Sequence, residues 1–564
     1  MRLAVPTLIL LLTLLTAEGP ATIPAAAPAP KPAAPDTIVV CPKEFVPALN
    51  PLLAHRFAQG HRFLYVPNTW SADEIRNSIR TSAKSGKLKA VLLVGDAEPK
   101  ADGDPAVRAR CVPTHRAAAK VNVKFGSEPE IGTDNWFADL DDDEVPDLTI
   151  GRLPADNAAE LTRIVDKILA YEKTQNHGPW RQRVNFVAGV GGFGGVLDGA
   201  IESSTKKLLT DGIPPAYQTN MTFGSWRSAY CPDPRRFHET AVARHNEGCL
   251  FWVYIGHGHP TGLDRVQVPG SQFHIFGCDD CGKLQAENGS PIAIMLACYT
   301  AAFDRGDDCL AEEMLRTAGG PVAVYGGSRV TMPYGMAVMS SEIMDEYFKN
   351  KPATIGEAIL HAKRNMVMVL DEKTLPQRPN RILLDAMASI LSPARAMLAQ
   401  ERQEHVHLFN LIGDPNLKLA YPQEVKLELQ GEPTPGGKLE LTAESPISGN
   451  VIIELLARRD IPKTNVPLRD HFDPSNAGLA KWQAVYEQAN DQVWFRKVLE
   501  VQVKGEGNAK FTEQLEIPAE ARGPAHVRVF IEGPEGHAVG IANINIKRVE
   551  KAEPMANRAE PATR

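Results

Sequence analysis

The chain has 564 residues, of which 43% are hydrophobic and 23% are charged, so it is ordinary globular material rather than a fibrous or disordered protein. This length is too great for a single core, and we expect roughly two to four domains. The formal net charge is −7 and no run is rich in Lys or Arg, which argues against nucleic acid or another polyanion as a partner.

Residues 1–35 have the order of a secretory signal peptide followed by a linker. Arg2 precedes an apolar run at 8–16, and small residues follow to Ala27. The run is too short to span a bilayer as a mature helix, and the prolines that follow prevent a longer one. We therefore expect an exported chain, extracellular, periplasmic or on the cell surface, with no membrane span in its mature form.

Apolar strands and amphipathic helices alternate over residues 36–422. Ser71 and Glu74 match a capping box, which predicts the start of a helix, and apolar residues recur at helical spacing after Asn157. The expected strands are short and apolar: 37–40, 90–94, 184–188, 250–255, 291–297 and 321–325. This alternation predicts an α/β fold with a mostly parallel sheet covered by helices.

The pattern changes near Pro422. Residues 423–548 contain segments in which apolar and polar residues alternate: 425–429, 438–442, 451–455 and 527–531. Alternation with period two between turn residues predicts a small antiparallel β-sandwich. The stretch 459–492 fits this pattern badly and is expected to be a long insertion or loop, and residues 549–564 are expected to be a disordered tail.

Two of the apolar strands end in reactive residues. The strand at 250–255 leads to His257 and Gly258, and the strand at 291–297 leads to Cys298. Parallel strands deliver chemistry at their carboxyl ends, so these residues are predicted to meet as a thiol nucleophile and its base. The backbone N–H groups of Gly258 and Cys298 would then stabilise the oxyanion. Taken singly, a buried apolar Cys and a core His are the commoner roles, but the pair favours catalysis.

The other cysteines leave several possibilities open. If Cys298 is a free nucleophile, seven cysteines remain, so at least one more is unpaired. Cys278 and Cys281 form a CxxC pattern that is compatible with half a zinc site, a redox pair or a local disulfide. No second CxxC motif supplies the other half of a zinc site.

A cluster of carboxylates suggests a calcium loop. Asp139, Asp141 and Asp143 recur at every second position and Asp147 follows, which is the spacing of oxygen ligands in such loops. The loop lacks the Gly and the terminal Glu of an EF-hand. The alternative is an acidic surface turn, although carboxylates this close repel each other without a cation.

These residues and several others resemble the gingipain family of cysteine peptidases, relatives of caspases. The resemblance rests on the block 251–258 that ends in His257 and Gly258, on Leu296-Ala-Cys298, and on motifs elsewhere over roughly residues 36–422. These motifs are Leu92-Leu-Val-Gly-Asp96, 134–141, Ile150-Gly-Arg-Leu-Pro154, Ala170-Tyr-Glu-Lys173 and Leu411-Ile-Gly-Asp-Pro415.

The resemblance implies a caspase-like catalytic domain at 161–422, a smaller α/β subdomain at 36–160 before it, and an immunoglobulin-like sandwich at 423–548 after it. By that resemblance His257 is the general base and acid, Cys298 is the nucleophile that forms a thioester, and proteins or peptides are the substrates. No cofactor is required for this chemistry, while calcium is common in the family. Gly191 stands where family members usually carry the acidic residue that orients the histidine.

The resemblance also implies a substrate pocket. Asp198 or Glu202 would supply the acidic residue that selects Arg or Lys in well-known members, and Tyr334 resembles an aromatic pocket wall. Two other functions remain open: a non-catalytic surface or adhesion protein that retains the fold, and a transpeptidase that passes the acyl group to an amine.

Overall fold

The computed structural model describes residues 34–190, 212–286, 289–371, 373–459, 463, 469–502 and 509–547. The expected signal segment up to residue 33, the tail after residue 547, and Gly191, Asp198 and Glu202 lie outside the described residues. No helix within the described part of the chain is both long enough and apolar enough to cross a membrane.

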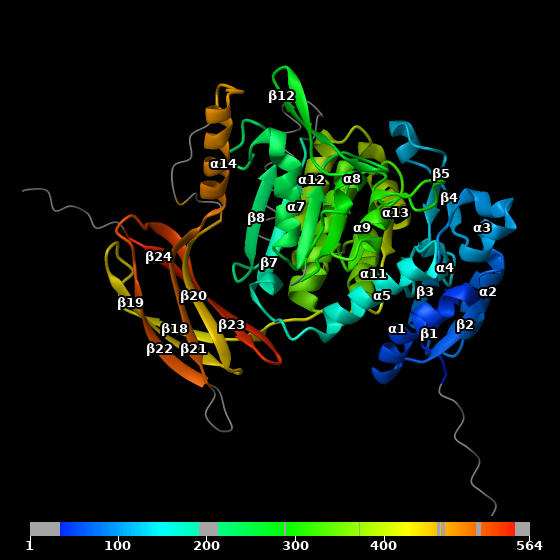
Figure 1. The fold of residues 1–564 in the computed structure, drawn as a ribbon, viewed down its shortest axis with the longest axis horizontal. Helices are drawn as coiled ribbons and strands as arrows, with labels where there is room; N and C mark the ends of the chain where they lie inside the picture. Colours follow the sequence, from blue (N-terminus) through cyan, green and yellow to red (C-terminus); the bar gives the residue numbers. More distant parts are fainter. Residues whose placement is uncertain are drawn as a thin grey trace, which may run out of the picture. The chain divides into compact units, whose positions relative to one another are not determined.

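A ten-stranded sheet runs through the larger part of the chain (Figure 1). Its strands, in spatial order, are β2 (Phe63–Pro67), β1 (Thr37–Cys41), β3 (Ala90–Val94), β6 (Thr149–Leu153), β16 (Phe409–Ile412), β15 (Ala323–Gly327), β14 (Ile292–Leu296), β9 (Phe251–Ile255), β7 (Arg183–Ala188) and β8 (Gln218–Phe223). Neighbouring strands are parallel except for β15 and β16, which run antiparallel. The predicted mostly parallel sheet is confirmed, and it is continuous across residue 160, where we placed a domain boundary.

Helices connect these strands and bury their apolar faces against the sheet. The principal ones are α1 (Val46–Ala58), α2 (Ala72–Ala83), α5 (Ala158–Lys173), α7 (Phe237–Asn246), α9 (Leu310–Arg316), α10 (Pro333–Asp345), α11 (Ile355–Val367), α12 (Pro379–Leu391) and α13 (Leu398–Leu408). Ser71 and Glu74 form the predicted capping box of α2. Asn157 accepts a hydrogen bond from the Glu160 N–H at the start of α5.

Alternating residues of β1 and β3 show that both faces of the sheet are covered. Val39 and Leu92 pack in the core that contains α1 and α5, whereas Val40 and Val91 pack in a second core that contains α2. Successive side chains of a strand point to opposite faces, so wholly apolar strands of this kind require a layer of helices on each side.

Two further sheets follow the main one (Figure 1). One contains β17 (Gln423–Glu424), β24 (Gly536–Ile546), β23 (Gly523–Gly533), β20 (Gly449–Ala457) and β21 (Val493–Val501), and the other β18 (Lys426–Gln430), β19 (Lys438–Ser445) and β22 (Ala509–Glu516). Their apolar residues share one core. The four predicted strands of this region are confirmed. The expectation of a loop is wrong for α14 (Asn476–Asn490), where Ser475 caps a helix that buries Trp482 and Tyr486.

Candidate active site

The carboxyl ends of β9 and β14 lie side by side at one edge of the main sheet. The two strands pair in parallel, with Ile255 opposite Leu296. His257 and Cys298 each lie two residues beyond this last pair. The Gly256 N–H also donates to the Leu296 carbonyl, at 3.2 Å, just before the chain reaches His257. The predicted placement of both reactive residues at neighbouring strand ends is therefore present in the structure.

Gly258 brings the two loops into direct contact. A Cβ atom at this position would lie 2.6 Å from the carbonyl oxygen of Cys298 and 3.0 Å from Cβ of Ala297. Any side chain here would push the loops apart, so glycine is required for the close approach. The backbone of the His-Gly segment thus packs on the backbone at Cys298, and the two oxyanion donors expected from the sequence, Gly258 and Cys298, lie at this contact.

The backbone of His257 is held by a buried tyrosine. Tyr254 is fully buried, and its hydroxyl donates to the His257 carbonyl at 2.8 Å. The Asp264 N–H donates to the same carbonyl at 3.2 Å. The His257 side chain itself is exposed. The sequence pattern did not single out Tyr254, because a tyrosine inside an apolar strand usually indicates a packing residue.

Cys298 is half-buried and faces Thr331, which follows β15. The Thr331 N–H donates to the Cys298 Sγ at 3.3 Å, and the thiol lies 3.6 Å from the Thr331 carbonyl oxygen. These contacts with Thr331 fix the position of the sulfur at the end of β14. No sequence signal pointed to Thr331, since it is 33 residues away along the chain.

The residue after Cys298 adopts an unusual backbone conformation. Tyr299 has a φ of +59°, in the left-handed region that non-glycine residues seldom occupy. Its N–H donates to the Arg329 carbonyl at 3.1 Å, and the Ala301 N–H donates to the Gly327 carbonyl at 3.0 Å. These two hydrogen bonds hold the loop after Cys298 against the end of β15 in a sharp turn, and Cys298 is half-buried there.

The other seven cysteines differ from Cys298. All eight are free thiols, and six are buried. Burial raises the pKa of Cys41 and of Cys231 to about 12, and it raises the pKa of Cys278 to about 12 with a smaller effect from Glu313. Thiols of this kind are poor nucleophiles at neutral pH. Cys278 and Cys281 form neither a disulfide nor part of a metal-ligand group among the described residues.

Tyr334, the predicted pocket wall, lies in the first turn of α10 and is 8% exposed. Its hydroxyl donates to Asp385 at 2.5 Å and accepts from Arg402 at 2.5 Å. The hydroxyl is therefore engaged in a polar network. Asp198, Glu202 and Gly191, the other residues considered for substrate and histidine contacts, lie outside the described residues.

Comparison with known proteins gives the family. The model of peptidase family C25 matches residues 30–420. The chain belongs to this family, the gingipains. Lys-gingipain HG66 of Porphyromonas gingivalis is 26% identical over 216 residues, which are 38% of this chain and 12% of that protein. The chain therefore spans far less than two thirds of the length of these curated relatives.

Solved gingipain structures share the fold. The crystal structure of the Arg-specific cysteine proteinase gingipain R aligns with a TM-score of 0.51 and 16% identity, over 93% of this chain and 100% of that one. A second structure, described as a protease, aligns with a TM-score of 0.51 and 16% identity over 91% and 98% of the two chains. The resemblance that the motifs carried is confirmed, as is a gingipain-like α/β fold with a large, mostly parallel sheet.

The predicted calcium loop brings three of its four carboxylates together. Oxygen atoms of Asp139, Asp141 and Asp147 lie within 4.8 Å of one another. Asp143 instead accepts a hydrogen bond from the Val145 N–H at 2.8 Å. Asp139 is 5% exposed and faces Arg76 at 3.1 Å. Hard oxygen donors at this spacing suit Ca²⁺, because two ligands at about 2.4 Å from an ion are at most about 4.8 Å apart.

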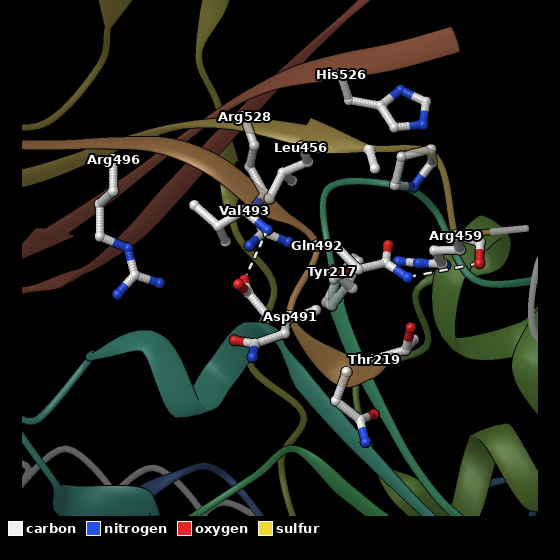
Figure 2. A pocket seen from close by; sticks show the side chains of 14 residues that line it. Tyr217, Thr219, Leu456, Arg459, Asp491, Gln492, Val493, Arg496, His526 and Arg528 are labelled. Atoms are coloured by element: carbon white, nitrogen blue, oxygen red, sulfur yellow. Dashed lines mark hydrogen bonds between the residues drawn. The ribbon is translucent and has the colours of Figure 1, made fainter. Parts of the chain in front are cut away.

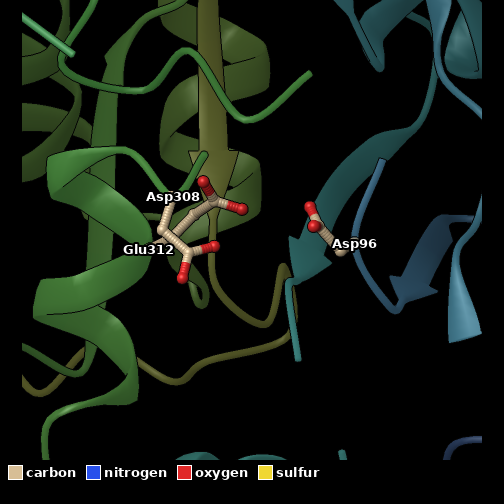
Figure 3. A group of neighbouring side chains, drawn as sticks. All are labelled: Asp96, Asp308 and Glu312. Carbon is tan, nitrogen blue, oxygen red and sulfur yellow. The ribbon is translucent and has the colours of Figure 1, made fainter. Parts of the chain in front are cut away.

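A second group of carboxylates was not foreseen (Figure 3). Asp96 follows β3, whereas Asp308 and Glu312 come from the start of α9, and their oxygens lie within 4.8 Å of one another. Burial raises the pKa of Asp96 to about 6 and that of Glu312 well above its usual range. Arg316 contacts Asp308 at 2.6 Å. The group is able to hold a cation or to retain a proton, and its two segments are too far apart in sequence for a motif to reveal it.

A polar pocket lies between β8 and the C-terminal sheets (Figure 2). Tyr217 and Thr219 line it from one side, and Arg459, Gln492 and Arg528 from the other. Arg528 is paired with Glu454. The pocket contains neither His257 nor Cys298.

Proposed function

We propose that the protein is a cysteine endopeptidase that hydrolyses peptide bonds through Cys298 and His257. The observation that carries this proposal is the packing of Gly258 on the Cys298 carbonyl, at the paired ends of β9 and β14. It supports a shared site for the two side chains. Membership of peptidase family C25 supports the reaction class.

The reaction proceeds by acyl transfer to sulfur. His257 removes the thiol proton of Cys298, and the thiolate attacks the carbonyl carbon of the scissile amide. The C–N bond breaks as the imidazolium of His257 returns the proton to the leaving amine, which leaves a thioester. His257 then takes a proton from water, the hydroxide attacks the thioester, and the carboxylic acid and the free thiol are released. The N–H groups of Gly258 and Cys298 would stabilise both oxyanions.

A substrate-profiling assay tests the proposal. Wild-type protein should cleave members of a broad peptidyl-amide library, and Cys298→Ala should lose this activity, since no other group forms the thioester. Cys278→Ala is the matched control, because it removes another half-buried thiol, and it should retain activity. A peptidyl electrophile should label wild type but not Cys298→Ala. Equal cleavage by Cys298→Ala would refute the mechanism, ligated products would indicate a transpeptidase, and no cleavage or labelling of wild type would favour the non-catalytic surface protein.

We also propose that the substrates carry a basic residue before the scissile bond. The relatives are named for Lys and Arg specificity, and Asp198 and Glu202 are the acidic residues considered for this pocket. Substrates that differ only in Lys, Arg, Gln or Leu at this position test the preference. Equal rates for Lys and Gln would argue against an acidic pocket.

Export, calcium and the C-terminal domain complete the proposal. The pattern at residues 1–35 supports secretion, which fractionation of cells expressing the chain with and without this segment would test. The three clustered carboxylates of the 139–147 loop support a structural calcium ion. Such an ion would hold the loop together and would take no part in the reaction. The two sheets of residues 423–546 around one core support an immunoglobulin-like sandwich, behind a smaller α/β subdomain and a caspase-like domain.

A further inference from the structure

A buried arginine lies where the main sheet meets the β23–β24 hairpin. Arg181 is in the short turn between α5 and β7 and is 4% exposed. Its Nε and Nη1 atoms are buried and have no hydrogen-bond partner within the described part of the chain. Among the described residues no carboxylate lies within 4.0 Å of its guanidinium nitrogens. A buried charge without a partner destabilises the folded state, so this guanidinium requires an anion.

Two imidazoles lie beside this guanidinium. His177 lies four residues before Arg181, and its Nδ1 atom is buried without a partner among the residues that the structure describes. His537 of β24 is 3% exposed and pairs across the hairpin with Glu532. A Cβ atom on Gly178 would lie 3.4 Å from the Glu532 Oε1, so the turn and the hairpin are in contact. Burial, and then the nearby charges of Arg181 and His177, lower the pKa of His537 to about 3.

The neutral neighbours of Arg181 do not neutralise it. Its guanidinium stacks over the Trp180 ring at 4.3 Å and lies 5.9 Å from the Tyr171 ring. The faces of these rings attract a cation but only partly replace its solvation. Donors and a fixed charge therefore converge here without an anionic acceptor among the described residues.

We propose that Arg181, His177 and His537 form a binding site for a small inorganic anion, of which chloride is the simplest, between the α5–β7 turn and the C-terminal hairpin. The bound anion compensates the guanidinium charge and accepts hydrogen bonds from its buried N–H groups. Because the turn precedes β7, the site is at the amino end of the sheet strands, opposite the edge that carries Cys298. Its role is to hold the hairpin against the main sheet.

Thermal unfolding of the full chain tests this proposal. Wild type is compared in sodium chloride and in sodium gluconate at equal ionic strength, since gluconate is too large for a buried site and screening is then constant. We expect a higher melting temperature in chloride, because a ligand that binds only the folded state stabilises it. Parallel titrations with sulfate and phosphate distinguish a halide from an oxyanion.

Variants separate an anion site from simple packing. Arg181→Met keeps the length of the side chain but removes the charge, so its melting temperature should be the same in all salts. It should exceed wild type in gluconate and lose that advantage in chloride. Arg236→Met, at an exposed arginine paired with Glu239, should respond to chloride as wild type does. Equal destabilisation of Arg181→Met in both salts would overturn the proposal in favour of a packing role.

A second measurement does not depend on the folding of a variant. Bromide soaked into crystals of the wild-type protein should give anomalous density beside Arg181 and His537. Absence of such density, with no difference between chloride and gluconate, would overturn the proposal. If both of these results are negative and Glu532→Gln lowers the melting temperature, Glu532 is the counter-ion of Arg181 instead.

Discussion

Two regions of the main sheet treat polar groups in opposite ways. At the ends of β9 and β14, His257 is exposed and Cys298 is half-buried, and the backbone and hydroxyl of Thr331 lie near the sulfur. In the other half of the sheet, Arg56 on α1 is 1% exposed and contacts Glu172 at 2.7 Å and Asp414 at 2.6 Å. A reactive group needs access to substrate, whereas a buried charge needs a partner. The first region is therefore expected to govern rate and the second to govern stability.

Removal of the imidazole should have the largest effect. His257→Ala is expected to lower kcat/KM for peptide hydrolysis by about 10²–10⁴-fold, because it removes the general base and acid. The free energy of unfolding should stay within about 0.5 kcal/mol of the wild-type value, since the side chain is exposed. His259→Ala, two residues away and also exposed, is the control and should retain most of the activity. Equal loss in both variants would point to a disturbed loop rather than to lost proton transfer.

The buried ionic group should show the converse behaviour. Arg56→Leu leaves Glu172 and Asp414 buried without their cation and is expected to cost about 3–5 kcal/mol in the free energy of unfolding. Urea denaturation measures this loss. Arg62→Leu, whose guanidinium stacks over Phe57 at 4.1 Å, should cost less than about 1 kcal/mol. A comparable loss in the two variants would contradict the role assigned to the buried group.

Acid should weaken the same ionic group. Despite the opposing effect of burial, hydrogen bonds and charge from Arg56 lower the pKa of Glu172 from 4.5 to about 2. A carboxyl group with a lower pKa in the folded state stabilises the protein fully above the unfolded value, and this contribution declines as pH falls from about 4.5 toward 2. Denaturation across this range should show the decline, and Glu172→Gln should reduce its slope. An unchanged slope in that variant would assign acid sensitivity to other groups.

The smallest expected effect concerns the support of His257. Tyr254→Phe removes the hydroxyl that donates to the His257 carbonyl, and a hydrogen bond of this kind is worth about 1 kcal/mol. We expect kcat to fall about fivefold with little change in KM. Tyr325→Phe, which removes another buried hydroxyl away from His257, should leave kcat unchanged. A change in KM alone would indicate a substrate contact rather than a positioning role.

Local patterns sufficed to predict much of the fold. Short apolar strands such as β9 and β14 are recognisable in the sequence, because a strand buried on both faces has no polar position. The capping box at Ser71 predicted the start of α2 for an equally local reason. The helix α14 was missed, since the stretch around it fits neither strand alternation nor a clear amphipathic repeat.

The candidate site was only partly predictable. Cys298 and His257 could be named because each follows its strand directly. Thr331 and Tyr254, which support them, could not be, because their contacts depend on the packing of separate loops. Among the carboxylates of the 139–147 loop, Asp143 is not part of the cluster formed by the other three, and residue spacing alone did not predict this.

The sequence by itself determined the family and the parallel strands and named the candidate residues His257 and Cys298, because these follow from motifs and from periodicity along one segment. Only the tertiary structure decided which distant charges meet. Arg56 contacts Asp414, which is 358 positions away, and Asp96 lies beside Glu312. Arg181 lies near His537 without an acidic partner among the described residues. Burial fixes the energy of a charge through whatever surrounds it in space, and spatial neighbours of this kind leave no trace in local sequence.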